Sequence, residues 1–250
     1  MYTRNNQRGA FLRYYFLFVI ALVSLSFTVF SQQKGIKYIA IGDVPNHTIQ
    51  QVSSIVEANN ERILTRYEIQ NMPQVTIKIW QDRHSFEASY GDNAQFVQGY
   101  VVPKDWEARF FNGRPDIGLG VVHEYTHLVT LAINSQFNNN PRWLWEAIAI
   151  FESERPPVPK INTLKCLAED VFPTLQNLEE HPFNIYKLGY YITDFILSTW
   201  DKQKLIELVK TNANLEAVLD VTTAEFESMW IDFLRHRYGM AFVENASQDC

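Results

Sequence analysis

This chain has few cysteines, and it has neither internal repeats nor low-complexity linkers. Its 250 residues include two cysteines, Cys166 and Cys250, which are too few for the disulfide framework of a small exported domain, and whether they pair stays open. The sequence has no internal repeat and no low-complexity linker, so it predicts neither a solenoid nor a string of modules. With 46% hydrophobic and 20% charged residues, it has the composition of a globular protein that can bury a core of its own.

Basic residues are also in short supply. The chain has 22 Lys and Arg against 28 Asp and Glu, a formal net charge of −6. Arg4, Arg8 and Arg13 stand before position 32 with no acid among them, so residues 32–250 are more acidic still. A protein that binds nucleic acid needs a basic stripe on its surface. This charge balance therefore excludes nucleic acid as an expected partner.

The N-terminal residues have the order of a secretory signal. Basic residues come first, a short apolar run follows from Phe16 to Phe30, and Val29 and Ser31 suit cleavage after Ser31. We therefore expect 1–31 to be removed and 32–250 to form one exported domain, periplasmic or extracellular. The alternative is an uncleaved anchor, which would keep the protein in contact with a membrane. The run is short of the roughly 20 apolar residues that span one, and no cysteine follows it for a lipid anchor.

The rest of the chain predicts an α+β fold, with a small mixed sheet in the N-terminal half followed by a helical half. Alternating and β-branched segments predict strands over 36–41 and 75–80, and one or two short strands within 96–112. Apolar periodicity predicts helices over 48–68, 83–90, 119–134, 141–154, 185–199, 201–210 and 223–238.

Two of these helices have recognisable start signals. Asn140 can serve as an N-cap with Pro141 in the first helical position of the helix at 141–154. Thr222, with Glu225 three residues later, forms a capping-box sequence before the last helix. These signals predict where the helices begin.

The clearest functional pattern is His123-Glu124-Tyr125-Thr126-His127, which falls inside the helix expected over 119–134. Residues four apart lie on one helix face, one turn apart, so both imidazoles can hold one zinc ion at about 2.0–2.1 Å from each nitrogen. Glu124 stands beside the first histidine, where its carboxylate can reach a water molecule at the metal. Apolar neighbours predict a buried helix, and buried imidazoles and carboxylates need partners, which a metal would supply.

A catalytic zinc takes a third protein ligand and keeps one position open. The next expected helix carries Trp143-Leu144-Trp145-Glu146-Ala147, in which a carboxylate is surrounded by apolar residues. Such a carboxylate is costly without a partner, and the turn between the two helices lets them pack as an antiparallel pair. We therefore expect Glu146 to be the third ligand. The alternative is a surface glutamate on a partly exposed helix.

The sequence His123-Glu124-x-x-His127, followed after eighteen residues by Glu146 within Trp-Leu-Trp-Glu-Ala, resembles the gluzincin metallopeptidases and their aminopeptidase branch in particular. The close match covers 118–152. The resemblance implies a zincin-like fold and a Zn²⁺ ion held by His123, His127 and Glu146, with Glu124 as general base in peptide-bond hydrolysis. Zincins in general suggest that a peptide or protein substrate lies extended along an edge strand near 96–112.

A second segment of the chain is similar to the same family. Tyr186-Lys187-Leu188-Gly189 resembles its Tyr-x-Lys-Gly segment, with the lysine displaced by one position. The tyrosine of that segment stabilises the oxyanion, so the resemblance makes Tyr186 a catalytic candidate; Tyr190 and Tyr191 follow closely, and all three could instead be packing residues. The Gly-x-Met-Glu-Asn segment that captures a free α-amino group is absent, and Ile150 stands where some members carry an acid. Aminopeptidase and endopeptidase activity therefore both stay open.

Two other interpretations remain. In the first, the chain is a catalytically inactive zincin-fold module that binds zinc and captures peptides, although the intact Glu124 argues against this. In the second, the motif is accidental and the purified protein holds no metal. The other histidines have no partner at metal-ligand spacing, so we expect them to be surface or packing residues; they are His47, His84, His181 and His236.

Overall fold

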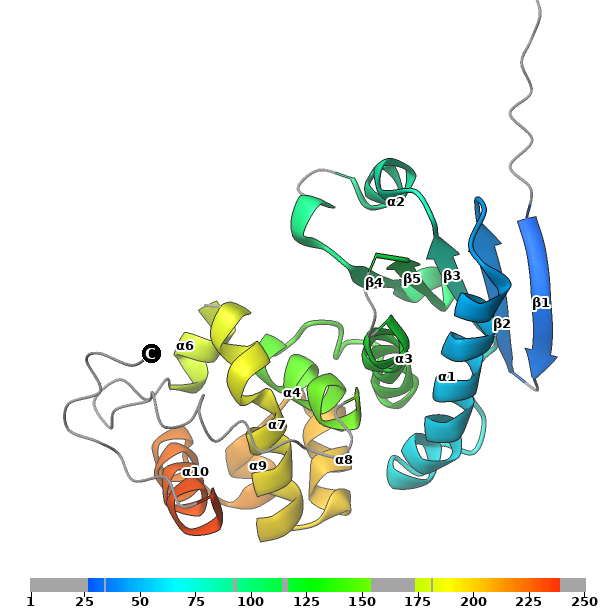
Figure 1. The fold of residues 1–250 in the computed structure, drawn as a ribbon. Helices are drawn as coiled ribbons and strands as arrows, with labels where there is room; N and C mark the ends of the chain where they lie inside the picture. The colour runs from blue at the N-terminus through cyan, green and yellow to red at the C-terminus, as the bar shows by residue number, and fades with distance from the viewer. Residues whose placement is uncertain are drawn as a thin grey trace, which may run out of the picture.

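The computed structural model describes residues 27–33, 35–91, 94–113, 117–153, 174–180 and 182–238. Over these residues a mixed sheet is followed by a mostly helical half, so the expected α+β class is confirmed. Figure 1 shows helix α3 (Ile117–Ile133) between the sheet on one side and the remaining helices of the C-terminal half on the other. The helix that carries the histidine motif therefore lies at the junction of the two parts.

The sheet has the strand order β1-β2-β3-β5-β4. Its central strands β2, β3 and β5 run parallel to one another, and β1 and β4 join the two sides antiparallel to their neighbours. In the described residues β4 is consequently an edge strand, paired only with β5. The strands are β1 (Phe27–Gln33), β2 (Ile36–Ile41), β3 (Val75–Trp80), β4 (Gly99–Val102) and β5 (Glu107–Phe111).

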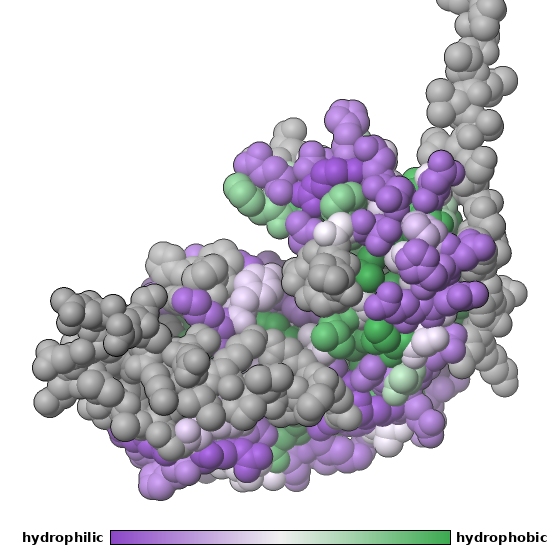
Figure 2. Space-filling model, in the orientation of Figure 1, coloured by the Kyte–Doolittle hydropathy of each residue, from purple (hydrophilic) through white to green (hydrophobic). Residues whose placement is uncertain are grey.

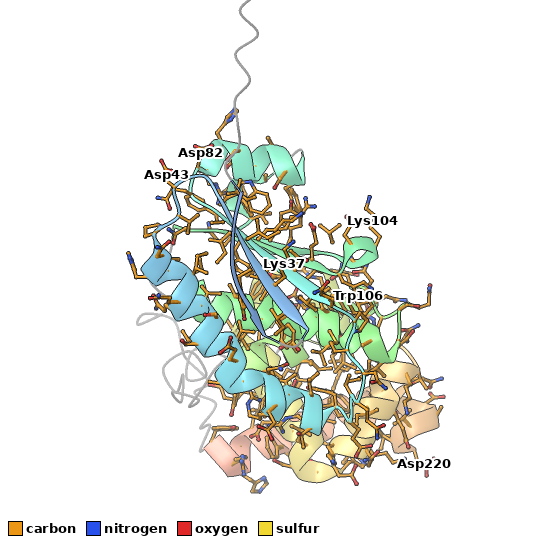
Figure 3. The ribbon with its side chains drawn as sticks, turned by 90° about the vertical axis from the view of Figure 1, so that its right-hand side faces the viewer. Lys37, Asp43, Asp82, Lys104, Trp106 and Asp220 are labelled. Atoms are coloured by element: carbon orange, nitrogen blue, oxygen red, sulfur yellow. The ribbon has the colours of Figure 1, made fainter. Side chains whose placement is uncertain are left out.

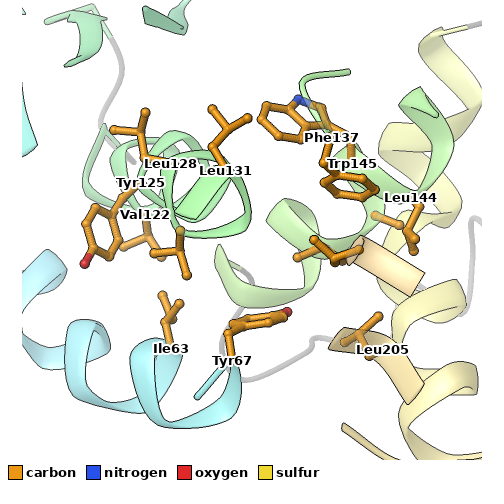
Figure 4. Close-up of a cluster of buried hydrophobic side chains, with 14 of the residues drawn as sticks. Ile63, Tyr67, Val122, Tyr125, Leu128, Leu131, Phe137, Leu144, Trp145 and Leu205 are labelled. Carbon is orange, nitrogen blue, oxygen red and sulfur yellow. The ribbon is translucent and has the colours of Figure 1, made fainter. Parts of the chain in front are cut away.

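One face of this sheet is apolar because the strand sequences alternate. In β3, Val75, Ile77 and Ile79 are fully buried, whereas the residues between them are only half-buried. The buried face packs against α1 (Asn46–Arg66) and α3 to form one continuous core. Figure 4 shows part of this core, in which Ile63 of α1 points toward Val122 of α3.

A shorter helix, α2 (Arg83–Tyr90), buries Phe86 in a small second cluster with Ile41 and Trp80. The rings of Phe86 and Trp80 meet edge to face at 5.9 Å. The helix begins at Asp82, whose carboxylate accepts a hydrogen bond from the backbone N–H of Ser85 at 2.6 Å. The expected helix over 83–90 is thus confirmed, and its local sequence explains its start.

Figure 3 shows the molecule from the side of β1. Asp43 and Asp82 lie together at one end of the sheet, because β2 and β3 are parallel and finish at the same edge. Lys104 and Trp106 lie at the connection between β4 and β5, which contains the single turn of 3-10 helix Pro103–Asp105. One or two short strands were expected within 96–112, and two are present, on either side of Pro103.

Three helices pack side by side around the motif, with α4 (Arg142–Ser153) between α3 and α7 (Pro182–Thr199). Gly189 lets α7 approach α4 closely, because a Cβ atom there would lie 3.0 Å from the Cα of Ala147 and 2.9 Å from Cδ1 of Ile150. The other described helices of this half are α6 (Leu175–Glu180), α8 (Lys202–Lys210), α9 (Leu215–Leu219) and α10 (Thr223–Tyr238).

The start of α10 follows its local sequence. The backbone N–H of Thr222 donates to the Glu225 carboxylate at 2.8 Å, and the N–H of Glu225 donates to the Thr222 hydroxyl at 3.2 Å. These two hydrogen bonds are the reciprocal pair of a capping box, so the prediction for this helix is confirmed.

The start of α4 differs from the prediction. The backbone N–H groups of Arg142 and Trp143 each donate to the carboxylate of Glu179 at 3.0 Å. Glu179 belongs to α6, and its carboxylate caps the N-terminus of α4. The sequence had predicted Asn140 for this role. A cap supplied by a distant segment leaves no trace in the local sequence, which explains the error.

Strand β1 was not expected, nor were the short helices α6 and α9. Because β1 spans Phe27–Gln33, cleavage after Ser31 would remove most of it and leave β2 at the edge of the sheet. Residues 1–26 and both cysteines, Cys166 and Cys250, lie outside the described residues. Within the described ranges, no helix is both long enough and apolar enough to cross a membrane.

Candidate metal centre

Helix α3 places its two histidines on one side. Residues 121–131 contain neither Gly nor Pro, and most of them are buried, so packing on nearly every side holds this helix. His123 and His127 are one turn apart, and their Nε2 atoms lie 3.2 Å from each other. Both rings therefore turn the same nitrogen toward one small space.

Helix α4 brings Glu146 to that space. Its Oε2 atom lies 3.2 Å from Nε2 of His123 and 3.9 Å from Nε2 of His127. Ligand atoms of the three residues all lie within 4.8 Å of one another. The three residues predicted as ligands thus form a group that could hold a metal ion.

The spacing of the three atoms suits a tetrahedral ion. Two ligand atoms bound to a tetrahedral zinc at about 2.0–2.1 Å lie roughly 3.3–3.4 Å apart, against 3.2, 3.2 and 3.9 Å in this group. The Oε2 atom of Glu146 is buried and receives no well-aligned hydrogen bond from any described residue, whereas a buried carboxylate oxygen normally has a donor. A cation between the three atoms would satisfy it.

Burial and proximity also give the ligands suitable charges. Burial lowers the pKa of His127 to about 3, and His123 acts in the same direction, so this imidazole is neutral near pH 7. Burial acts to raise the pKa of Glu146, but His123, His127 and Arg142 outweigh it and hold the pKa at about 2. Neutral imidazole and ionised carboxylate are the forms that bind a metal.

An aromatic neighbour orients the second histidine. Trp145 stacks on His127 with ring centroids 4.1 Å apart and planes 7° apart, and Phe137 packs against Trp145, as Figure 4 shows. A metal-bound histidine usually donates its other ring N–H to a carboxylate or carbonyl. In the described residues, the buried Nδ1 of His127 has no such acceptor. Stacking, rather than a hydrogen bond, therefore sets the orientation of this ring.

Glu124 lies beside the ligand group. It follows His123 on α3, and its side chain is partly accessible. Burial raises the pKa of Glu124 to about 7, with His123 lowering it and Glu146 raising it further. A carboxyl group with a pKa near neutrality can take up and release a proton at ordinary pH. These are the position and the electrostatics that a general base would need.

Of the three candidate tyrosines on α7, Tyr186 is the one whose ring has a described contact with the ligand group. Its ring centroid is 6.4 Å from that of His123, and 47% of the residue is exposed. Burial of its hydroxyl and the nearby Glu146 carboxylate raise the pKa of Tyr186. Tyr190 and Tyr191 pack instead against aromatic rings of α4 and α10. The structure therefore favours Tyr186 over its two neighbours as a residue of the site.

Two charged residues on α4, the helix of Glu146, were missed in the sequence. Arg142 stands one turn before Glu146, with its Nη2 atom 3.9 Å from Oε1 of that carboxylate. Glu152, at the other end of α4, is fully buried and pairs with Arg62 and Arg66 of α1. The spacing of four residues could have indicated Arg142. No local signal points to α1 as the partner of Glu152.

Comparisons with known proteins assign no family to the chain: no protein-family model matches it, and no curated protein matches it. The structure itself supports a His-His-Glu group that could hold a metal ion. The metal and the reaction have to be argued from the chemistry of this group and its neighbours.

Proposed function

We propose that the protein is a zinc-dependent metallopeptidase. The observation that carries this proposal is the convergence of His123, His127 and Glu146 on one point beside Glu124. Two imidazoles and one carboxylate are a donor set of catalytic zinc sites, which keep a fourth position for water or substrate. Structural zinc sites are built mainly from cysteine, and this group contains none.

A zinc ion in this group would supply a Lewis acid that polarises a water molecule and lowers its pKa to about 7. Glu124 takes the proton of the attacking water and passes it to the leaving amine. Tyr186 donates a hydrogen bond to the oxyanion, since a tyrosine hydroxyl is protonated near neutral pH and the environment of Tyr186 raises its pKa further. His123, His127 and Glu146 do not exchange protons; they would hold the ion in a fixed position relative to Glu124 and Tyr186.

The substrate lies extended along β4 in this proposal. The strand is an edge of the described sheet, and α3 packs against both β4 and β5. An edge strand offers unpaired backbone N–H and C=O groups, which can bind a peptide by strand addition. A peptide held there would run past the helix that carries His123 and Glu124.

Replacing Tyr186 with Phe tests the oxyanion role. The change removes the hydroxyl and keeps the ring, so we expect kcat to fall by up to about 10²-fold with little change in KM. Tyr190→Phe is the matched control, because Tyr190 packs against Phe151 with centroids 5.0 Å apart and should leave kcat nearly unchanged. Equal kcat values for the Tyr186→Phe variant and the parent would remove Tyr186 from the mechanism.

Elemental analysis of the purified protein tests the site itself. We expect near-stoichiometric zinc in the parent and a large loss in Glu146→Ala, because two imidazoles alone bind the ion far more weakly. Glu61→Ala, a change of the same kind at an exposed position of α1, should keep its zinc. A parent that holds no metal after zinc has been supplied would exclude the proposed zinc enzyme and leave an α+β domain with an accidental motif.

The second candidate function is a zinc-bound module that captures peptides without cleaving them. A protein that keeps stoichiometric zinc but cleaves nothing in a broad peptide library would favour this alternative. We further propose that the protein works outside the cytoplasm, on the basis of the signal-like order of residues 1–31. Analysis of the N-terminus of the protein recovered from its natural host would show whether those residues are removed.

A further inference from the structure

We propose that Arg142 binds a carboxylate of the substrate, so that the enzyme prefers peptides with a negative charge on the residue that follows the scissile bond. The inference rests on the proposed peptidase function and names its substrate class. Its starting point is the cationic side chain of Arg142, which stands beside Glu146 and whose contacts with described side chains are a 3.9 Å approach to that carboxylate and an interaction with Tyr186.

The position of Arg142 is set by α4. Arg142 and Glu146 are four residues apart and share one helix face. The Nη2 atom of Arg142 lies 3.9 Å from Oε1 of Glu146, whereas Oε2 of the same carboxylate is turned toward the histidines. Arg142 also interacts with the hydroxyl of Tyr186. The guanidinium therefore lies between the third ligand and the candidate oxyanion donor, and 21% of its side chain is exposed.

Most of the donors of Arg142 are open. A guanidinium has five N–H donors, and a contact of 3.9 Å is too long to be a hydrogen bond. Arg83 shows the contrast, since its guanidinium donates to the Glu87 carboxylate and to three backbone carbonyls at 2.7–2.8 Å. Within the described residues, the side chain of Arg142 can therefore take up a ligand without giving up such a network.

The guanidinium of Arg142 favours an anionic ligand. It is always positively charged, and it lies 3.9 Å from the outer oxygen of Glu146, whose other oxygen faces the histidines. The carboxylate of Glu179 accepts hydrogen bonds from the backbone N–H groups of Arg142 and Trp143, and in the described residues it forms no ion pair with the Arg142 side chain. A carboxylate bound by Arg142 would form a charge-assisted, bidentate pair of the kind that guanidinium groups prefer.

The reach of the substrate limits where this carboxylate can be. Successive Cα atoms of a peptide are about 3.8 Å apart. If the reacting carbonyl lies at the metal, the next residue of the substrate therefore stays within a few ångströms of the metal ligands, where Arg142 also lies. Both a C-terminal carboxylate and an Asp or Glu side chain meet this condition. A peptide that is blocked at its C-terminus and uncharged at this residue does not.

Binding to the Glu124→Gln protein loaded with zinc provides the test, since that protein should hold peptides without cleaving them. A peptide that the parent cleaves next to its last residue is made with a free C-terminal carboxylate and as the amide. A second pair carries Glu or Gln after the scissile bond in an amidated peptide. Titration calorimetry should show that at least one carboxylate form binds about tenfold or more tightly than its neutral partner. The first pair reports a C-terminal carboxylate and the second a side-chain carboxylate.

Adding Arg142→Gln to the Glu124→Gln protein should bring the affinity ratio close to one, and Arg142→Lys should restore part of the preference through its charge. Equal affinities in both pairs for the protein with Arg142 intact would overturn the inference, and so would a preference that survives Arg142→Gln. The comparison of charged with neutral peptides uses the protein with Arg142 intact, so it tests the inference even if the Arg142→Gln variant folds poorly. Zinc content, measured in each protein, separates the two failures. Absence of zinc refutes the proposed peptidase, whereas a zinc-loaded protein without the preference refutes only the role of Arg142.

Discussion

Glu124→Gln should leave zinc bound and lower peptide hydrolysis by about 10²–10⁴-fold. The substitution keeps the size and the hydrogen-bonding shape of the side chain but removes the group that accepts a proton from water. Because Glu124 supplies none of the three ligand atoms, zinc content by elemental analysis should equal that of the parent. Initial rates on a peptide from a broad library, measured beside that zinc content, separate loss of the base from loss of the metal.

The matched control for this variant is Glu61→Gln, the same chemical change at an exposed position on α1. We expect it to keep both zinc and activity, because no described contact depends on the Glu61 side chain. Full activity in Glu124→Gln would show that another group takes the proton. Loss of zinc together with activity would instead place Glu124 among the residues that hold the ion.

The parts of the site that the sequence predicted are those that depend on local geometry. The spacing of His123 and His127 fixes them on one face of a helix before any tertiary contact is known, and their Nε2 atoms indeed lie 3.2 Å apart. The prediction of Glu146 used one step more, namely that a carboxylate among apolar residues needs a partner. The same local reasoning gave the strands over 36–41 and 75–80 and the helix over 223–238 within a residue of their ends.

The parts that the sequence did not predict are formed by contacts between distant segments. Glu179 of α6 caps α4, and Trp145 orients His127 by stacking on its ring. The pairing of β1 with β2 brings residues 27–33 into the sheet, although the same residues read locally as the end of an apolar signal. Alternation and helix periodicity describe one segment at a time, so they do not show which segments meet.

Glu152 shows how far such a contact can support the site. It lies on the same helix as the third ligand, and its side chain is fully buried. Arg62 donates to its Oε2 atom and, at 2.8 Å, to its backbone carbonyl, while Arg66 lies 2.8 Å from Oε1. Tyr67 donates to Oε1 at 3.2 Å. Since α1 also packs on α3, this cluster connects the two helices that carry the candidate ligands.

Glu152→Ala should therefore destabilise the fold by about 3 kcal/mol, the lower end of the range for removing one partner of a buried ion pair. The lower end applies because Arg62 and Arg66 are 18% and 22% exposed, so water can solvate part of the charge left behind. Urea unfolding of the metal-free proteins measures this change without the stabilisation that a bound ion adds.

Glu61→Ala provides the reference for that measurement and should shift stability by no more than about 0.5 kcal/mol. If Glu152→Ala does not fold, Glu152→Gln allows the same comparison, since it keeps the shape of the side chain and removes only its charge. Stability within about 1 kcal/mol of the reference would mean that the arginines are solvated well enough without Glu152. A large loss would mean that this charge cluster holds α4, the helix that carries Glu146, against α1. Zinc affinity should then fall with stability in the Glu152 variants, because a helix released from α1 no longer holds Glu146 against the two histidines.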